Sequence, residues 1–558
     1  MERIWLKQYP PEVPASISTE SIPSLSHLID EALAEFASQT AYISMGKSIT
    51  YSELNDMAEA FAAWLQSLGL GRGDRVALMM PNLLQYPIAL VGTLRAGCVV
   101  VNCNPLYTAR ELEHQLVDSG ATTIVIVENF AHTLEKVIHK TAVRNVVVTS
   151  LGEMLGGAKG LIVNLVVRHV KKLVPAYNLP QAIGFKDALN LGRGHTLSRP
   201  SLGPEDIAFL QYTGGTTGVS KGAILTHANI SANVLQAEAW IKPVVRRGQE
   251  FILTALPLYH IFALTANCLT FMRIGAQNLL ITNPRDIPNF IKEWSKYPVS
   301  TITGVNTLFN ALLNNPEFKN LNFSSLRLTL GGGMAVQKPV ADRWHATTGV
   351  VLSQAYGLTE TSPAATINLI TESFNGSIGL PISSTDVSIR DDEGRELAQG
   401  DIGEICIKGP QVTPGYWNRP DETSLIFTGD GYLKTGDLGY VDEQGYVFIV
   451  DRKKDMILVS GFNVYPNEVE EAAVEHPGIQ EAAAIGVPDP QCGEVVKLFV
   501  VRKDPALNEE AIIAHCRSLL TNYKVPKHIE FRDELPKTNV GKILRRALRE
   551  PVTSEMTN

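Results

Sequence analysis

Cysteine is scarce in this chain, and the few cysteines present are not spaced for cross-linking or metal binding. There are six, with no Cys-x-x-Cys pair and no cluster of neighbouring histidines: Cys98, Cys103, Cys268, Cys406, Cys492 and Cys516. A disulfide-rich secreted domain or a cysteine-based zinc site would need closer and more regular spacing. The sequence therefore predicts reduced, mostly buried thiols in a cytoplasmic protein.

Positive charge is not in excess either. The chain has 49 Lys and Arg against 57 Asp and Glu, which gives a net charge of −8. A protein that binds nucleic acid usually carries a basic surface, so this balance argues against a nucleic-acid partner. Because the overall field repels polyanions, a phosphate-binding site would have to be built locally.

Long hydrophobic runs are nearly absent. The N-terminus has charges on both sides of a very short apolar patch and lacks the apolar core of a secretion signal. Residues 251–272 contain no charged side chain and could cross a bilayer by length alone. Because Pro257, His260 and Asn267 interrupt this run, a buried strand and helix beside an internal site are favoured over a transmembrane helix.

The patterns that are present predict an α/β fold. Uniformly apolar runs at 75–80, 123–127 and 146–149 are typical of buried strands. Helical patterns separate them, one beginning near Ser52, as in parallel sheets covered by helices on both faces. From about residue 385, short strands with frequent glycine turns predict a small β-barrel or a meander.

A charged stretch at 451–455 suits an exposed linker and divides the chain. We expect a large N-terminal domain over residues 1–450, which holds the covered parallel sheets and the small β-barrel, and a small α+β domain over 451–558. A chain of 558 residues is too long for one hydrophobic core, which supports this division.

A glycine-rich loop within residues 212–221 is the strongest local signal for chemistry. Glycines let backbone N–H groups approach anionic oxygens, while threonine hydroxyls and a lysine add donors and charge. The candidate phosphate ligands are Thr213, Gly214, Gly215, Thr216, Thr217, Gly218 and Lys221. The loop lacks the Gly-Lys-Ser/Thr ending of P-loop NTPases, which disfavours a kinase or GTPase. A flexible linker is the alternative, although apolar, strand-like runs on both sides argue against it.

The region from Gly156 to Pro180 mixes apolar and basic residues at helical spacing. Two interpretations stay open. The helix could pack on the core with a solvated cationic edge, or it could dock on an anionic membrane surface.

Further short motifs follow the glycine-rich loop. They are Pro257-Leu-Tyr-His260, Gly331-Gly-Gly-Met334, Tyr356-Gly-Leu-Thr-Glu360, Thr435-Gly-Asp437, Asp451-Arg452 and Lys537-Thr-Asn-Val-Gly-Lys542. In this order and with these separations they resemble the adenylate-forming superfamily of acyl-CoA synthetases, adenylation domains and luciferases, over nearly the whole chain. The segments 104–114, 173–177 and 459–468 resemble bacterial long-chain fatty acid CoA ligases in particular.

This resemblance implies a ligase that joins a long-chain fatty acid to CoA through an acyl-adenylate, with ATP and CoA as co-substrates and Mg²⁺ as cofactor. It implies that the glycine-rich loop holds the β- and γ-phosphates, that Thr359 contacts phosphate and that Glu360 binds Mg²⁺. Lys542 would screen the repulsion between the carboxylate and the α-phosphate. His260 would shape the acyl-carboxylate site, with a core histidine as the alternative.

The resemblance also assigns the nucleoside and CoA contacts. Adenine would stack on Tyr356 against Gly331, Gly332 and Gly333, and the ribose would contact Asp437 and Arg452. Asp437 is preferred to Asp430 because only its Thr-Gly-Asp motif follows Gly431-Tyr-Leu-Lys434. The 451–455 stretch would be a hinge that lets a mobile C-terminal domain present either Lys542, or Gly461, Phe462 and Asn463 beside CoA.

Two departures limit the resemblance. Gly215 stands where many members have Ser, and Leu264 stands where some long-chain members have a gating Trp, so a gated acyl tunnel is not implied. Alternatives are a ligase for medium-chain or aromatic acids, a carrier-loading adenylating enzyme and an inactive lipid-binding protein. We expect a cytoplasmic protein and leave open both peripheral contact with the inner membrane and a homodimer.

Overall fold

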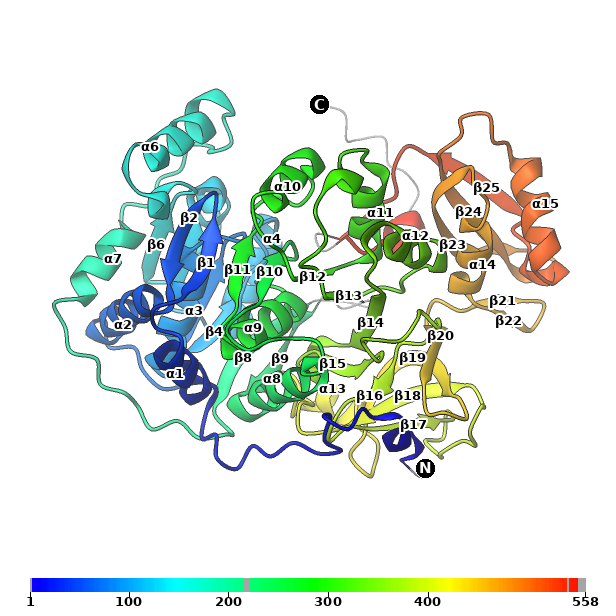
Figure 1. Cartoon of the computed structure of the whole chain (residues 1–558), viewed down its shortest axis with the longest axis horizontal. Coiled ribbons are helices and arrows are strands. Elements are labelled where there is room, and N and C mark those ends of the chain that lie inside the picture. Colours follow the sequence, from blue (N-terminus) through cyan, green and yellow to red (C-terminus); the bar gives the residue numbers. More distant parts are fainter. Residues whose placement is uncertain (1–2, 214–219, 539–540, 550–558) are drawn as a thin grey trace.

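Two large, mainly parallel sheets with helices on their faces make up most of the molecule (Figure 1). The computed structural model describes residues 3–213, 220–538 and 541–549. The seven-stranded sheet has the order β7 (Ala182–Gly184), β6 (Asn145–Thr149), β5 (Thr123–Val127), β3 (Arg75–Met79), β4 (Val99–Asn102), β8 (Ile207–Thr213) and β9 (Lys221–Thr226). Only β9 runs antiparallel to its neighbour. The predicted α/β class is confirmed.

The second sheet has nine strands. Their order is β16 (Leu380–Pro381), β15 (Ala364–Ile367), β14 (Leu352–Gly357), β13 (Leu328–Gly332), β12 (Thr301–Gly304), β10 (Phe251–Thr254), β11 (Gln277–Leu280), β1 (Thr40–Ser44) and β2 (Lys47–Thr50). The strands from β14 through β1 are parallel, and antiparallel strands close both edges. The carboxyl ends of β12, β13 and β14 therefore meet along one edge.

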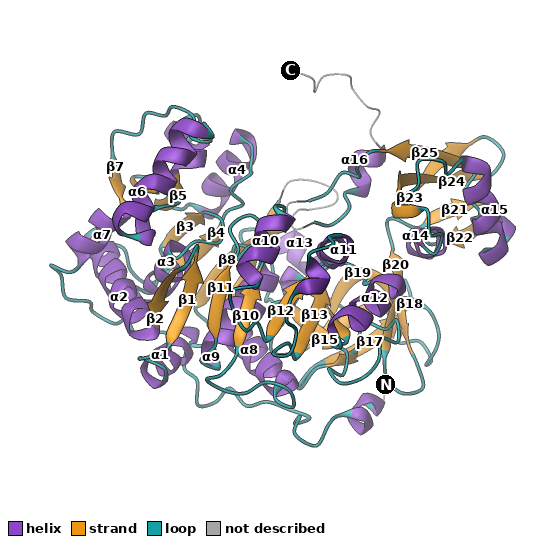
Figure 2. Cartoon of the chain, turned by 45° about the horizontal axis from the view of Figure 1, so that its top comes forward, coloured by secondary structure: helices purple, strands orange, loops and turns teal. Residues whose placement is uncertain are grey.

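Helices cover these sheets and fill the space between them (Figure 2). The helices of the larger part are α1 (Leu25–Glu35), α2 (Tyr51–Ser67), α3 (Gln85–Arg95), α4 (Ala109–Ser119), α5 (Ala131–Glu135), α6 (Gly157–Leu165), α7 (Phe185–Gly192), α8 (His227–Ile241), α9 (Phe271–Arg273), α10 (Ile287–Trp294), α11 (Asn306–Asn314), α12 (Lys338–Thr348) and α13 (Pro420–Leu425). The largest apolar core joins both sheets through α1, α2, α3 and α8. Every residue of α3 is buried.

The start of α2 corrects one sequence expectation. The sequence suggests Ser52 as the N-cap of this helix, but the N-cap is Thr50. The Thr50 side chain accepts a hydrogen bond from the Glu53 backbone N–H, and the Glu53 carboxylate accepts one from the Thr50 N–H. This reciprocal pair satisfies two N-terminal donors, so α2 begins at Tyr51, one residue before Ser52.

The region after residue 385 is a meander. The strands β17 (Asp386–Arg390), β18 (Gly403–Lys408), β19 (Leu433–Val441) and β20 (Val447–Arg452) pair antiparallel in chain order. Within the described residues β17 and β20 are not paired with each other. The sheet is therefore open, and the small β-barrel expected from the sequence is corrected to its alternative.

The C-terminal part forms a separate small α+β unit. Its sheet has the order β22 (Phe462–Val464), β21 (Ile457–Val459), β24 (Gly493–Arg502) and β23 (Ile479–Asp489), with β25 (His528–Arg532) beside β24. Its helices are α14 (Pro466–Val474), α15 (Glu509–Leu519) and α16 (Arg545–Arg549), and it has apolar clusters of its own. The expected linker 451–455 precedes this sheet, although Asp451 and Arg452 still belong to β20.

Residues 251–272 form a buried strand and a buried helix, as the sequence predicts. They comprise β10, a π-helix at Ala263–Thr270 and the first residues of α9. In the part of the chain that the structure describes, no helix has both the length and the apolar character needed to cross a membrane. All six cysteines are free thiols, and five of them are buried.

The close contact between α2 and α7 depends on a glycine. A Cβ on Gly192 would lie 1.8 Å from the carbonyl oxygen of Ala60 in α2. We expect Gly192→Ala to lower the free energy of unfolding by about 1–3 kcal/mol, because the two helices would have to separate. Gly71→Ala is the matched control, since a Cβ there has no atom within 4 Å, and it should change stability by less than about 0.5 kcal/mol. Urea denaturation of both variants measures the difference, and equal effects would contradict this account of the packing.

Candidate active site

The residues expected at the nucleotide site gather at the shared carboxyl edge of β13 and β14. Gly331 and Gly332 end β13 and pair with Gln354 and Ala355 of β14. A Cβ on Gly332 would lie 2.9 Å from the Phe262 ring, so the strand edge admits no side chain there. This edge brings the glycine motif alongside the tyrosine motif, as a flat nucleobase slot would require.

Tyr356, Asp437 and Arg452 form one contact chain. The Tyr356 hydroxyl donates to Asp437 Oδ2 at 2.6 Å, and Arg452 Nε lies 3.3 Å from Asp437 Oδ1. Asp437 and Arg452 also face each other across the β19–β20 pair. Asp437 is almost fully buried, and burial raises its pKa despite the opposing effects of Arg452 and Tyr356. Two candidate ribose ligands thus lie against the candidate adenine platform.

Asp430, the competing aspartate, has a different environment. Its carboxylate pairs with Arg390 through two hydrogen bonds at 2.7 and 2.9 Å, and Thr428 donates to it as well. These contacts hold the turn between Thr428 and Tyr432, where Gly431 has a φ of 85°. The expectation that Asp430 is a turn residue fits this geometry.

Lys542 reaches this cluster from the C-terminal unit. A Cβ on Gly333 would lie 3.2 Å from Lys542 Cε, and the Thr307 hydroxyl donates to the neighbouring Gly541 carbonyl at 3.2 Å. Burial, and to a lesser degree the charge of Arg452, lowers the pKa of Lys542 to about 8, while Asp437 opposes this shift. The lysine therefore lies in a partly desolvated position with one carboxylate close enough to stabilise its charged form.

His260 lies near the charge of Lys542. Burial, with a smaller contribution from Lys542, lowers its pKa to about 3, so the imidazole is neutral at physiological pH. Its Nδ1 accepts a hydrogen bond from the Phe262 backbone N–H at 3.3 Å, which leaves the proton on Nε2. Leu264, four residues after His260, is fully buried in the π-helix. His260 can thus offer one neutral donor near Lys542.

Glu360 lies in a short 3₁₀-helix at Thr359–Thr361, directly after β14. The Tyr416 hydroxyl donates to Glu360 Oε1 at 2.6 Å, and Lys221 Nζ lies 5.3 Å from the centre of the Tyr416 ring. Glu360 Oε2 has no hydrogen-bond partner among the described residues. Tyr416 therefore connects the glutamate to the lysine at the end of the glycine-rich loop.

The sequence predicts that Glu360 binds Mg²⁺, and the side chains around Glu360 bear on this prediction. In the residues that the structure describes, no three His, Cys, Asp or Glu side chains gather into a metal site. One oriented carboxylate with a free oxygen nevertheless fits Mg²⁺, which usually keeps several waters and takes its other ligands from substrate phosphates. The residues present therefore fit a magnesium ion that binds together with a nucleotide.

The glycine-rich loop connects the hairpin strands β8 and β9, as its apolar flanks predict. Thr213 ends β8 opposite Lys221 at the start of β9, and the Ser220 hydroxyl donates to the Thr213 carbonyl at 2.6 Å. The remaining candidate phosphate ligands lie outside the described residues: Gly214, Gly215, Thr216, Thr217 and Gly218. Lys221 forms an ion pair with Glu422.

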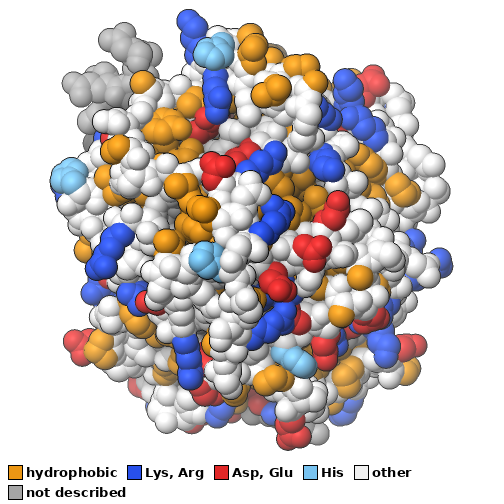
Figure 3. Space-filling view, turned by 90° about the vertical axis from the view of Figure 1, so that its left-hand side faces the viewer, with side chains coloured by type: hydrophobic (Ala, Val, Ile, Leu, Met, Phe, Trp, Pro, Cys, Tyr) orange, Lys and Arg blue, Asp and Glu red, His pale blue; other side chains and the backbone are white. Residues whose placement is uncertain are grey.

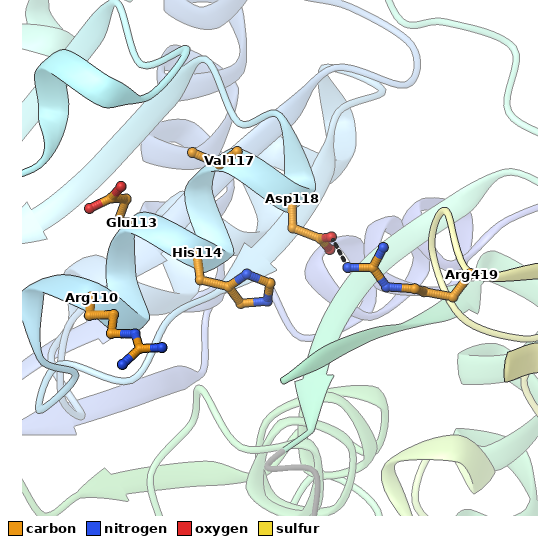
Figure 4. Close-up of a pocket in the computed structure, with 6 residues that line it drawn as sticks. All are labelled: Arg110, Glu113, His114, Val117, Asp118 and Arg419. Carbon is orange, nitrogen blue, oxygen red and sulfur yellow. Dashed lines mark hydrogen bonds and ion pairs between the residues drawn. The ribbon is translucent and has the colours of Figure 1, made fainter. Parts of the chain in front are cut away.

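A cavity of about 450 Å³ lies beside this hairpin (Figure 4). Its lining residues are Arg110, Glu113, His114, Val117, Asp118 and Arg419. His114 Nε2 lies 2.8 Å from the Ser220 carbonyl oxygen, and Arg419 pairs with Asp118 at 3.0 Å. The cavity is lined by side chains of both charges and lies between α4 and the segment that carries Tyr416 and Arg419.

The expected CoA-binding residues lie elsewhere, in contacts within the C-terminal unit. Gly461 has a φ of 85° and no atom within 4 Å of a Cβ placed on it. Phe462 is 57% exposed and stacks on Tyr523, and Asn463 pairs with Leu458. In Figures 1 and 2, β22 lies on the far side of this unit from β13 and β14. This structure therefore brings Lys542 to the cluster and keeps the Gly461 loop away from it.

Sequence reasoning missed Tyr416 and Glu422. Neither residue lies in a short glycine or charge motif, and their contacts with Glu360 and Lys221 join positions about 56 and 201 residues apart in the chain. The only sequence signal is the aromatic pair Tyr416-Trp417, which resembles an ordinary core feature. The fold is needed to recognise their place beside the loop.

Related proteins match this chain in sequence over nearly its whole length. It is 58% identical over 560 residues to a long-chain-fatty-acid–CoA ligase of Escherichia coli, with 100% of both chains covered. It is 40% identical to a protein of the same name from Bacillus subtilis, with 99% of this chain and 98% of that one covered.

Solved structures resemble the fold throughout. The anthranilate CoA ligase AuaEII in complex with anthranoyl-AMP has a TM-score of 0.85 at 26% identity, over 96% of this chain and 98% of that one. ATP-bound MatB from Rhodopseudomonas palustris has a TM-score of 0.80 at 28% identity, over 94% of this chain and 98% of that one.

Two family models match the chain. Residues 468–542, which end at Lys542, match the AMP-binding enzyme C-terminal domain, and residues 29–417 match the AMP-binding enzyme family. The second match covers most of the chain and includes the glycine-rich loop, Tyr356 and Glu360. The chain therefore belongs to the AMP-binding enzyme family.

Proposed function

We propose that this protein is a long-chain fatty acid–CoA ligase that acts through an acyl-adenylate. The observation that carries the proposal is the full-length, 58% identity to a long-chain-fatty-acid–CoA ligase. The cluster of Tyr356, Asp437, Arg452 and Lys542 supports it, because residues from separate parts of the chain converge where ATP chemistry needs them. Ligation of medium-chain or aromatic acids and loading of a carrier protein have no comparable support.

In the first step the protein would bind ATP along the edge of β13 and β14. Adenine would stack on Tyr356 against Gly331, Gly332 and Gly333, and the ribose hydroxyls would donate to Asp437 beside Arg452. The phosphates would lie against the glycine-rich loop, with Thr213 and Lys221 at its two ends and Thr359 beyond it. Within the described residues, Tyr356, Asp437 and Arg452 already contact one another, so little reorganisation of this part of the site would be needed on binding.

Lys542 and His260 would then act on the two reacting anions. The carboxylate of the fatty acid has to approach the α-phosphate, and the main barrier is their repulsion. The Lys542 ammonium would lie between them, where partial desolvation makes a fixed charge more effective than in water. The neutral His260 would donate from Nε2 to the carboxylate.

Glu360 would hold Mg²⁺ through its free oxygen while Tyr416 holds the other oxygen in place. When bound, the ion would neutralise part of the phosphate charge. Tyr416 is thus a positioning residue in this proposal. Burial, followed by the neighbouring Glu360, raises its pKa, so it stays a hydrogen-bond donor at physiological pH.

The second step would use the other orientation of the C-terminal domain. We place the boundary between the domains at 450 and 451 and the hinge at 451–455. Rotation there would withdraw Lys542 and bring Gly461, Phe462 and Asn463 to the site, where the CoA thiol attacks the acyl-adenylate and releases AMP. The open space around Gly461 fits the approach of a ligand to its backbone. The cytoplasm is the compartment that this reaction and the free thiols favour.

Pyrophosphate release with different acids tests the proposed function. We expect palmitate to give a kcat/KM roughly 10²-fold or more above octanoate or benzoate, because each buried CH₂ contributes about 0.8 kcal/mol.

Glu360→Gln keeps the acceptor for Tyr416 but removes the charge, and it should lower the rate of pyrophosphate release by roughly 10²-fold or more with an unchanged melting temperature.

Glu372→Gln is the matched control, because Glu372 also accepts a hydrogen bond from a tyrosine, Tyr446, outside the site. Its rate should stay that of the wild type. A preference for benzoate, or equal losses in the Glu360 and Glu372 variants, would contradict the proposal.

The two half-reactions should be separable by mutation. Lys542→Ala should lower pyrophosphate release by roughly 10²-fold or more, yet convert supplied acyl-adenylate and CoA to thioester at nearly the wild-type rate. Gly461→Leu should do the reverse, because its side chain would obstruct the CoA path. Gly394→Leu controls for backbone strain, since Gly394 has a φ of 80° and equally open space. If both site variants lose both steps equally with intact folds, rotation of the C-terminal domain is the wrong account.

A further inference from the structure

One segment of the chain exposes an unusual number of large apolar side chains. The segment comprises α6, the π-helix at Val166–Val170 and the residues just after it. Five of its apolar side chains are more than half exposed: Leu161 (74%), Ile162 (61%), Leu165 (58%), Val170 (68%) and Leu173 (52%). Single exposed apolar residues are ordinary, but a contiguous group marks an interaction surface. We call this group the α6 face.

The helix is attached to the protein by its small and polar side. Asn164 accepts a hydrogen bond from the Gly152 N–H at 2.7 Å and donates to the Ser150 hydroxyl at 2.9 Å. Gly160 packs so closely on Gly152 that a Cβ there would lie 2.4 Å from the Gly152 carbonyl oxygen. Arg168 pairs with the buried Glu128 at 2.7 Å.

This orientation is the reverse of the usual one for a surface helix. Residues 160, 164, 167 and 168 follow helical spacing and face the protein, whereas the leucines and the isoleucine face outward. A helix that served only the core would turn its apolar side inward. The sequence left open that the apolar side of this helix packs on the core. The structure contradicts that interpretation, because only Gly160 and Val167 of α6 and the π-helix are buried.

The α6 face is basic as well as apolar. Residues 154–186 contain no Asp or Glu, but they contain Lys159, Arg168, Lys171, Lys172 and Lys186, in a chain whose net charge is −8. Lys171 and Lys172 are exposed. Figure 3 faces this side of the molecule and shows hydrophobic and basic side chains next to one another near its top, where α6 lies in Figure 1.

We propose that the α6 face docks the protein on an anionic lipid surface. Its apolar side chains would enter the boundary between headgroups and acyl chains, and its lysines would lie among the anionic headgroups. A second copy of this chain is a poorer partner, because two identical basic faces would bring like charges together. Charge complementarity therefore selects anionic lipid.

Docking would serve the proposed function, on which this inference partly rests. A long-chain fatty acid gains about 0.8 kcal/mol per CH₂ by leaving water, so most of it resides in membranes rather than in solution. An enzyme held at the lipid surface would meet its substrate there. Binding to vesicles can be measured without any substrate, so failure of the docking proposal and failure of the ligase proposal are distinguishable.

Vesicle co-sedimentation of the full-length protein tests the proposal. The probes are vesicles of phosphatidylcholine alone and of phosphatidylcholine with about one-third phosphatidylglycerol, at low and high salt. We expect the wild type to bind the anionic vesicles, with affinity falling as salt rises. Leu161→Gln/Leu165→Gln should weaken binding by roughly tenfold or more through lost apolar burial.

Lys171→Glu/Lys172→Glu should weaken binding by roughly 30-fold or more at low salt and reduce the salt dependence. Leu425→Gln, at an equally exposed leucine in α13, and Lys319→Glu/Lys503→Glu, at exposed lysines elsewhere, should leave binding unchanged. The lysine control matches its test variant in the kind and number of substitutions, and the leucine control repeats the same Leu→Gln change at one exposed position elsewhere.

Two results would overturn the proposal. One is that the wild type does not bind anionic vesicles at low salt, or that the leucine and lysine test variants bind them as tightly as the wild type does. The other is a dimer in sedimentation velocity that Leu161→Gln/Leu165→Gln converts to a monomer, since the face would then be covered by a second copy. Circular dichroism confirms that each variant is folded.

Discussion

The site depends on one electrostatic arrangement, in which a partly desolvated ammonium, Lys542, lies near a single buried carboxylate, Asp437. Each group alone would be costly to bury, because a charge loses its hydration. Burial shifts both pKa values toward the neutral forms, and their mutual attraction opposes that shift. Arg452 adds a second positive charge, so the cluster of Lys542, Arg452 and Asp437 carries a local positive excess inside a protein of net charge −8. An anionic nucleotide would relieve this excess.

The topology places these groups together although they are distant in sequence. Parallel strands end at a common edge, so β13 and β14 deliver Gly332 and Tyr356 side by side. The meander β17–β20 supplies Asp437 and Arg452 as cross-strand neighbours, and the C-terminal unit supplies Lys542. The same β19–β20 pair leads directly into the proposed hinge, which would couple the proposed ribose contacts to the position of the C-terminal domain.

The sequence predicts the residue types at the site better than their supporting contacts. Short motifs with strong chemistry, such as the one ending at Lys542, predict positions that the structure brings together. Tyr416 escapes because its contact with Glu360 exists only in the folded chain. The open meander could not be separated from a barrel, since strand patterns do not determine whether a sheet closes. The outward direction of the α6 face also required the structure, because apolar helical spacing alone does not show which side meets the core.

The pH dependence of adenylation tests the central claim about Lys542 most directly. With a free-enzyme pKa of about 8, the lysine is charged below that pH and loses its charge above it. The account predicts that kcat/KM for ATP in pyrophosphate release falls above about pH 8 in the wild type. In Lys542→Arg the rate should be lower but flat from about pH 7 to about pH 9.5, because a guanidinium stays charged. The same decline in both proteins, or a flat wild-type profile, would contradict the claim that this ammonium drives the reaction.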